Sequence, residues 1–221
     1  MSGARVLACF TPGGDILHGM LRLFVLILAL CLIPSASRAD DIELRVSPYL
    51  LVGGGGDVKF NSTAVSDAGS WGAGASVGFG TRFEAAITQY ISIGGLFEFA
   101  SLGLDGVRIF GFALTPDRAK IMDFDVWVKG GTRFDLGPGE LEVYGGIPFG
   151  LTVGITSFND ERETNPGYNL GLLGGAQYWF DRFGVFTELG YRFHKIIDGG
   201  EVRQSSRLSQ IVWHLGGSIA F

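Results

Sequence analysis

Eight segments of this chain alternate between bulky apolar side chains and small or polar ones. In the segment 140–156, for example, Leu141 and Val143 share one face, whereas Glu142 and Tyr144 share the other. Successive side chains of a β-strand point to opposite faces. The alternation therefore predicts strands with one apolar and one polar face, and an all-β fold.

The spacing of these segments predicts an up-and-down barrel. We expect strands at about 42–53, 71–85, 90–102, 120–135, 140–156, 168–180, 183–195 and 208–221. The three connections at 86–89, 136–139 and 181–182 are tight, and the four at 54–70, 103–119, 157–167 and 196–207 are longer. An even strand number with alternating short and long connections is typical of bacterial outer-membrane barrels, whose short turns are periplasmic. Both termini would then be periplasmic.

The apolar faces indicate a membrane barrel. After residue 39 no stretch reaches the 18 or so apolar residues of a spanning helix. Lipid excludes unpaired backbone groups, so strands that cross a membrane must close into a barrel. The polar face is rich in glycine and would line the lumen, because eight strands leave room only for side chains. The alternative is a soluble eight-stranded barrel such as a lipocalin, with the apolar face inside.

Aromatic residues fall near both predicted strand ends, where the membrane interfaces favour them. The expected inner girdle is Phe83, Phe134, Phe180, Phe183 and Phe221. The expected outer girdle is Trp71, Phe99, Phe124, Tyr168, Phe193 and Trp213.

The amino-terminal 39 residues are typical of a secretory signal peptide. Arg22 precedes an apolar run of 11 residues, and Ser37 and Ala39 are the small residues of a cleavage site before Asp40. Met20 would give a signal of ordinary length, so Met20 is a candidate translation start in place of Met1. The predicted domains are thus the signal peptide, 1–39, and one barrel domain, 40–221.

Cleavage would remove three arginines and one aspartate from the 17 basic and 22 acidic residues. The mature chain would have 14 basic and 21 acidic residues, a net charge of −7. Such an acidic protein is a poor partner for nucleic acid. Both cysteines would also be lost, which excludes disulfides and thiolate metal sites. We expect no cofactor, no metal and no enzymatic activity.

The expected lumen face collects charged residues. They are Glu43, Arg45, Arg82, Glu84, Glu98, Asp123, Asp125, Lys129, Arg133, Glu142, Glu188, Arg192 and His194. Charges in a narrow lumen must pair to offset desolvation, so we expect a network that plugs the barrel. A gated ion path and acid–base catalysis remain alternatives. His214 shares the lumen face, but Ser218 lies too far along the strand to pair with it as a nucleophile.

The carboxy-terminal half carries a family resemblance. It has the sequence Leu-Gly-Gly-Ala-Gln-Tyr-Trp-Phe at 173–180, Phe-Thr-Glu-Leu-Gly-Tyr-Arg-Phe at 186–193, and a final strand that ends at Phe221. These glycine–aromatic strands resemble the small outer-membrane barrels: the OmpA transmembrane domain, OmpX, OmpW and the opacity-type proteins. The resemblance implies the fold and an outer-membrane location. It implies no particular ligand, because these barrels serve as anchors, adhesins, small pores and enzymes.

The predicted function is an outer-membrane barrel with a largely plugged lumen, acting as a structural or surface-interaction protein through its outer loops. The alternatives are a narrow channel for ions or small solutes, and a barrel enzyme that modifies lipid A. The expected partners are outer-membrane lipid, lipopolysaccharide and the barrel insertion machinery, and the expected state is a monomer. The expected assembly signal is Trp213, Leu215, Ile219 and Phe221, although Gly217 departs from the bulky residue common at that position.

Overall fold

The computed structural model describes the barrel region of the chain. The described residues are 42–62, 70–104, 107–109, 112–114, 118–158, 161–198 and 204–221. The chain divides into two units, Met1–Ala39 and Asp40–Phe221. The predicted signal peptide, Met20 and the cleavage site lie outside the described residues.

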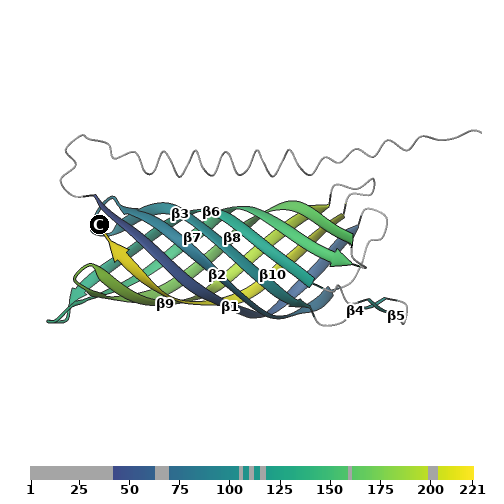
Figure 1. Ribbon diagram of the computed structural model, residues 1–221, viewed down its shortest axis with the longest axis horizontal. Coiled ribbons are helices and arrows are strands. Elements are labelled where there is room, and N and C mark those ends of the chain that lie inside the picture. The colour runs from purple at the N-terminus through teal and green to yellow at the C-terminus, as the bar shows by residue number, and fades with distance from the viewer. Residues whose placement is uncertain are drawn as a thin grey trace, which may run out of the picture. The chain divides into compact units, whose positions relative to one another are not determined.

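Eight long strands form a closed antiparallel barrel in the order β1-β10-β9-β8-β7-β6-β3-β2 (Figure 1). They are β1 (Glu43–Ser62), β2 (Ser70–Ala86), β3 (Ile91–Leu104), β6 (Arg118–Asp135), β7 (Glu140–Phe158), β8 (Glu161–Phe180), β9 (Phe183–Asp198) and β10 (Gln204–Ala220). Two short strands, β4 (Val107–Ile109) and β5 (Phe112–Leu114), pair with each other within the connection from β3 to β6. The predicted all-β, eight-stranded up-and-down barrel is confirmed.

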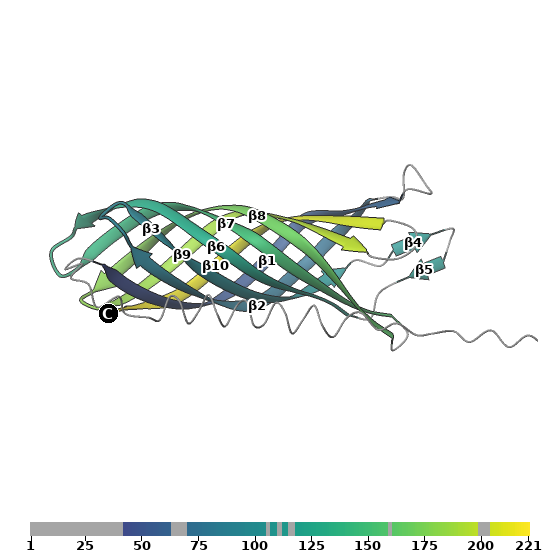
Figure 2. The ribbon, with the colours of Figure 1, turned by 90° about the horizontal axis from the view of Figure 1, so that it is seen from above.

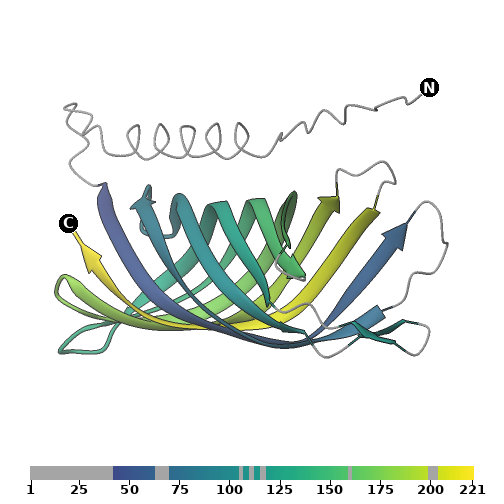
Figure 3. The same cartoon turned by 45° about the vertical axis from the view of Figure 1, so that its right-hand side comes forward.

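The first and last strands close the barrel. Arg45 pairs with Ala220, and the amide of Phe221, just beyond β10, donates to the carbonyl of Leu44 at 2.8 Å. The strands are strongly tilted, as seen from two directions in Figures 1 and 2. The carboxy-terminal end of β10 lies at the same end of the barrel as the tight turns (Figure 3). Among the described residues, no helix has the length and apolarity needed to cross a membrane.

The polarity of the barrel is that of a membrane protein. Its exterior carries large exposed apolar side chains, such as Leu50 (65% exposed), Leu172 (65%) and Leu189 (61%), whereas Arg82 and Glu188 are buried inside. A soluble barrel would bury the apolar face and expose the charged one. The lipocalin-like alternative is therefore wrong. This arrangement matches the outer-membrane type of barrel, with an apolar exterior and a polar interior.

The strands are longer than the sequence predicts at the end away from the tight turns. The predicted connection 54–70 is strand as far as Ser62, and β8 begins at Glu161 rather than 168. The tetraglycine at 53–56, expected to be a flexible strand end, instead lies within β1 at a register shift between Gly54 and Asp57. Gly55 has a φ of 65°, a conformation that favours glycine. Past this bulge the strand continues in register with β10.

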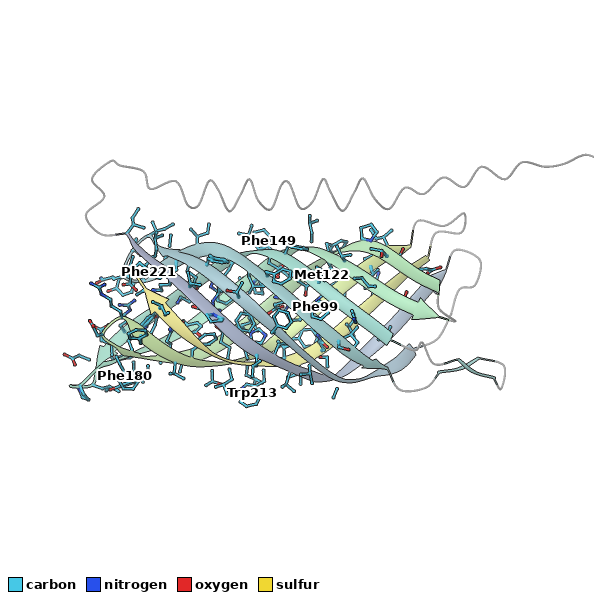
Figure 4. All side chains as sticks on the ribbon, in the orientation of Figure 1. Phe99, Met122, Phe149, Phe180, Trp213 and Phe221 are labelled. Carbon is cyan, nitrogen blue, oxygen red and sulfur yellow. The ribbon has the colours of Figure 1, made fainter. Side chains whose placement is uncertain are left out.

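The outer girdle of aromatic residues is therefore not aligned with the strand ends, although Trp71 is the second residue of β2. Phe99 and Trp213 lie well inside the length of the barrel, whereas Phe180 and Phe221 lie at the tight-turn end (Figure 4). The outward side chains beyond Phe99 and Trp213 change in character. Where described, they include the cations Lys59, Lys120, Lys195 and Arg207 rather than a further apolar belt.

The turn between β8 and β9 offers a local test of the fold. Asp181 is the first residue of this two-residue turn and has a φ of 56°, unlike Arg182. A β-branched residue tolerates this region poorly, so Asp181→Val is expected to lower the free energy of unfolding by about 1–2 kcal/mol. Denaturant unfolding in detergent would measure it, with Arg182→Val as the matched control. Equal losses in both variants would contradict the turn geometry.

Candidate functional site

The predicted lumen charges form one network of short contacts that runs along the barrel. The links made by arginine and lysine are ion pairs, whereas the links made by histidine are ionic only when the imidazole is protonated. The links, from the tight-turn end onward, join Arg133 to Glu43, Glu43 to Arg45, Arg45 to Glu142, Glu142 to Lys129, Lys129 to Glu84, Glu84 to Arg82, Arg82 to Glu188, Glu188 to His214, His214 to Glu98, Glu98 to Arg192, Arg192 to Asp123 and Asp125, and Asp123 to His194. All thirteen predicted residues lie in it, and His214 joins its two halves.

The layer nearest the tight turns is built around Glu142. Its carboxylate accepts from Arg45 Nη1 at 3.2 Å and pairs with Lys129 Nζ at 3.0 Å. The indole nitrogen of Trp179 donates to the same carboxylate at 2.9 Å. Arg45 also donates from Nε to Glu43 at 2.6 Å. The Glu142 carboxylate thus holds side chains from three other strands together across the lumen.

The central layer is built around the guanidinium of Arg82, which is 0% exposed. Arg82 Nη1 donates to Glu188 Oε1 at 2.6 Å, and its Nε lies 3.5 Å from Glu84 Oε1. The guanidinium carbon also lies 4.6 Å from the ring centroid of Trp127 and 4.9 Å from that of Phe186. A cation held between two aromatic rings and two carboxylates fills the middle of the barrel.

Further hydrogen bonds and a ring stack hold the side chains of this central layer in place. Tyr144 donates its hydroxyl to Glu188 at 2.7 Å, and His214 Nδ1 lies 3.0 Å from the other oxygen of that carboxylate. The ring of Tyr49 stacks on His214 with centroids 4.7 Å apart. Trp127 donates its indole N–H to Glu84. Most polar groups of the layer therefore find partners within the protein, as buried polar groups require. The exceptions in this layer are Nε and Nη2 of Arg82 and Nε2 of His214, which form no hydrogen bond with the described residues.

The third layer gathers carboxylates around Arg192. Arg192 Nη2 lies 2.8 Å from Asp125, 2.9 Å from Glu98 and 3.2 Å from Asp123. His194 Nε2 lies 2.9 Å from Asp123 as well. The amide nitrogen of Asn169 donates to Asp125 at 2.7 Å, which satisfies a further acceptor.

Large apolar side chains also fill the lumen, so the expectation of a small polar face is only partly correct. One buried cluster consists of Tyr49, Leu96, Trp127, Tyr144, Leu173, Phe186 and Val212. Glycines make room for the rings: a Cβ on Gly146 would lie 2.0 Å from Trp127, and one on Gly80 would lie 2.4 Å from Tyr49. The inward glycines thus serve as the recesses into which aromatic side chains pack.

A second apolar cluster lies inside the barrel toward the end away from the tight turns. Val58, Ile121 and Leu208 are buried there, and Leu102 and Ile196 pack against them. Each of these positions lies farther from the tight turns than the charged residues of its own strand that join the network. The ionic network is therefore followed, away from the tight turns, by an apolar layer.

At the opposite end, a cavity of about 480 Å³ opens among the tight turns. Glu43, Arg133, Glu140, Trp179 and Phe221 are among the residues that line it. The network residues that reach this cavity are the partly exposed ones at the rim, and the buried Arg45, Lys129 and Glu142 do not line it. The cavity therefore ends at the outer residues of the first ionic layer and does not reach the buried residues of that layer.

The alternation of side chains along each strand identifies the inward face, but it does not single out several residues of the site. Trp127, Trp179, Tyr49 and Asn169 all bind network carboxylates. Trp127 stands between Asp125 and Lys129 on the same face of β6, so the alternation contained the signal. Which carboxylate each ring would meet depends on contacts across the lumen, which no local pattern reveals.

The two histidines of the described residues, His194 and His214, face carboxylates rather than a nucleophile. Within the described parts of the chain, neither imidazole forms a hydrogen bond with a serine hydroxyl. Ser218 instead shares a hydrogen bond with Ser47, with the two hydroxyl oxygens 2.6 Å apart. The described residues also contain no group of three or more histidine, cysteine, aspartate or glutamate side chains arranged to hold a metal ion.

The four residues of the predicted assembly signal share the outward face of the closing strand. Trp213, Leu215, Ile219 and Phe221 are 46%, 45%, 40% and 73% exposed. Trp213 donates its indole N–H to Thr187 on the neighbouring strand at 2.8 Å, which satisfies this polar atom on an apolar surface.

No family model matches this chain, and no curated protein matches it in sequence. Solved structures do. The chain is similar to Neisserial surface protein A, with 15% identity over 81% of this chain and 97% of that one and a TM-score of 0.41. It is similar to Ail, the attachment invasion locus protein of Yersinia pestis, with 16% identity, coverage of 81% and 98%, and a TM-score of 0.40. It is also similar to the outer membrane protein OprG from Pseudomonas aeruginosa, with 10% identity, coverage of 81% and 95%, and a TM-score of 0.45.

Proposed function

We propose that this protein is an outer-membrane barrel with a closed lumen, which acts as a structural or surface-interaction protein rather than as a pore. Its tight turns and both ends of the barrel domain face the periplasm, and its longer connections face outward. The apolar exterior and polar interior support the membrane location, because only lipid rewards this polarity.

The observation that carries the proposal is the placement of Arg82. Its fully buried guanidinium lies between Trp127 and Phe186 and pairs with Glu188, at the centre of a network that links strands around the barrel. An ion crossing here would have to separate buried ion pairs and aromatic rings at once. Separating buried pairs costs several kcal/mol. The geometry thus favours a plugged barrel over the narrow-channel alternative.

A liposome-swelling assay would test the closed lumen with small solutes. Purified protein reconstituted into liposomes is expected to leave the uptake of small sugars and amino acids at the rate of protein-free liposomes. A conducting outer-membrane porin serves as the positive control. Uptake that rises with the amount of folded protein would favour the channel alternative.

The remaining alternative is an enzyme that modifies lipid A, and it can be tested by a separate prediction. Because both imidazoles bind lumen carboxylates, we expect no modification of lipid A by this protein. Mass spectrometry of lipid A from cells with and without the gene should give the same profile. A mass difference that depends on His194 or His214 would overturn the non-enzymatic proposal.

Deletion of Phe221 is expected to impair assembly of the barrel. The residue ends the outward apolar face of β10 and donates its amide to Leu44 at the closing seam. We expect at least a several-fold loss of folded protein in the outer membrane, measured as the heat-modifiable species on gels. Phe221→Tyr, which keeps an aromatic end, is the control. Normal insertion of the shortened chain would contradict its role as an assembly signal.

A further inference from the structure

A row of three cations crosses the outer surface of the barrel on adjacent strands. In the strand registers, Lys59 of β1 is directly opposite Arg207 of β10, and Arg207 is directly opposite Lys195 of β9. Their neighbours Val58, Leu208 and His194 are buried inside. Because alternate side chains of a strand point to opposite faces, the three cations point outward.

This basic row lies beyond most of the apolar surface, although Ile197, 45% exposed, follows Lys195 on the outward face of β9. On β9 it comes after the exposed Leu189 and Tyr191, and on β10 it comes after the exposed Trp213 and Ile211. The neighbour of this row on β8 is Tyr168, which is 45% exposed and lies directly opposite Lys195 in the strand register. The ammonium of Lys195 lies 5.8 Å from the centroid of that ring. An aromatic residue and a cation side by side are typical of a membrane interface.

The row has no internal charge compensation among the side chains that the structure describes. No ion pair joins Lys59, Lys195 or Arg207 to a described carboxylate, whereas the lumen collects seven carboxylates in its network. Like charges directly opposite each other in a sheet are destabilising, since their Cβ atoms lie only about 5 Å apart. Three such cations in succession are therefore best stabilised by an anion from outside the chain.

The structure assigns this row as a binding site for the phosphate groups of an anionic lipid headgroup in the outer leaflet. Strands are spaced by about 4.8 Å, so the row spans about 10 Å and suits a headgroup with more than one phosphate. The acyl chains of this lipid would lie along the apolar side chains on the tight-turn side of the row, beside Tyr168 and Ile211. This inference rests on the proposed membrane location and names diphosphorylated lipid A, the anchor of lipopolysaccharide, as the class of ligand.

Native mass spectrometry of the folded barrel in a non-ionic detergent would test the site. The probes are diphosphoryl lipid A and the same lipid with both phosphates removed. The wild-type protein should retain the phosphorylated lipid, and the variant K59Q/K195Q/R207Q should bind it at least tenfold more weakly. Binding of the phosphorylated lipid should fall as salt rises.

Lys120 supplies the matched control. It also points outward beyond the apolar surface, with its ammonium 5.7 Å from the ring of Phe99, but its cross-strand neighbours are the uncharged Ser101 and Ile155. Lys120→Gln is therefore expected to change lipid A binding less than twofold. A loss in this variant equal to that of the triple variant would indicate general electrostatic attraction and overturn the assignment.

Three further outcomes would overturn the assignment. They are equal binding of the phosphate-free lipid, unchanged binding by the triple variant, and displacement of lipid A by inorganic phosphate at the same concentration. The last would indicate a site for free anions. Heat-modifiable mobility of every variant shows independently whether the barrel is folded. If the wild-type protein lacks that mobility shift, the membrane-barrel proposal itself fails, which is distinct from failure of the lipid site.

Discussion

Replacing Arg82 with alanine is expected to lower the free energy of unfolding of the barrel by about 3–5 kcal/mol. The substitution removes a guanidinium that is 0% exposed and leaves Glu84 and Glu188 buried with one fewer cation between them. It also opens a void between Trp127 and Phe186. Denaturant unfolding in lipid vesicles, followed by tryptophan fluorescence, would measure the loss.

Arg133→Ala is the matched control, because Arg133 belongs to the same network but lies at its rim. Its side chain is 30% exposed and pairs with Glu43 and Glu140 near water. Its Nε also lies 3.7 Å from the buried Glu142, but that carboxylate keeps Arg45 and Lys129 as partners when Arg133 is removed. Exposed ion pairs contribute about 1 kcal/mol or less, so this variant should lose no more than that. Neutralising Glu188 in the Arg82→Ala background should restore part of the stability. Equal losses for Arg82→Ala and Arg133→Ala would contradict a central ionic plug.

The second large effect is expected at Gly146, which faces the indole of Trp127. A Cβ at this position would lie 2.0 Å from Cη2 of a side chain that is 0% exposed. The ring cannot retreat easily, because its indole N–H is bound to Glu84 and Arg82 lies over its face. Gly146→Ala is therefore expected to destabilise the barrel by about 1–3 kcal/mol through overpacking.

The neighbouring Gly145 provides the control on the same strand. It faces outward, and the nearest atom to an added Cβ is the carbonyl oxygen of Leu173 at 3.7 Å, an ordinary contact. Gly145→Ala is expected to change stability by less than about 0.5 kcal/mol. The same unfolding experiment compares the two. If both alanine variants are equally stable, the glycine recess does not serve to accommodate Trp127.

The fold could be predicted from the sequence because lipid imposes a simple rule on each membrane-crossing strand. An outward residue must be apolar, so segments such as 140–156 show a clear period of two. The same parity assigned charged residues, including Glu188 and Arg192, to the inside. Both predictions use only local alternation and the number of strands.

The extended parts of the strands were missed for the same reason. Beyond the apolar surface no hydrocarbon requires the outward side chains to be apolar, and the sequence after Gly56 is polar on the face that would otherwise be apolar. It reads as a loop, although Val58 pairs in register with both Leu208 and Trp71. A register shift within a run of glycines further hides the strand, since the inward parity changes there.

Contacts across the lumen lay beyond the reach of any sequence pattern. Arg82 and Glu188 are 106 residues apart in sequence and meet because of the tilt and stagger of the closed sheet. Alternation shows that both side chains point inward, but it does not show at what height each one stands. The pairing of Trp179 with Glu142, and of Tyr49 with Glu98, depends on the same geometry.

The central claim is that the lumen is closed by its own side chains. Electrical recording from single barrels in planar lipid bilayers tests it most directly, with folding of the inserted protein verified by heat-modifiable mobility. We predict that the wild-type protein gives no stable, discrete conductance steps under applied voltages of either sign. Reproducible openings of fixed size in the wild-type protein would contradict the closed lumen and establish a conducting path past Arg82.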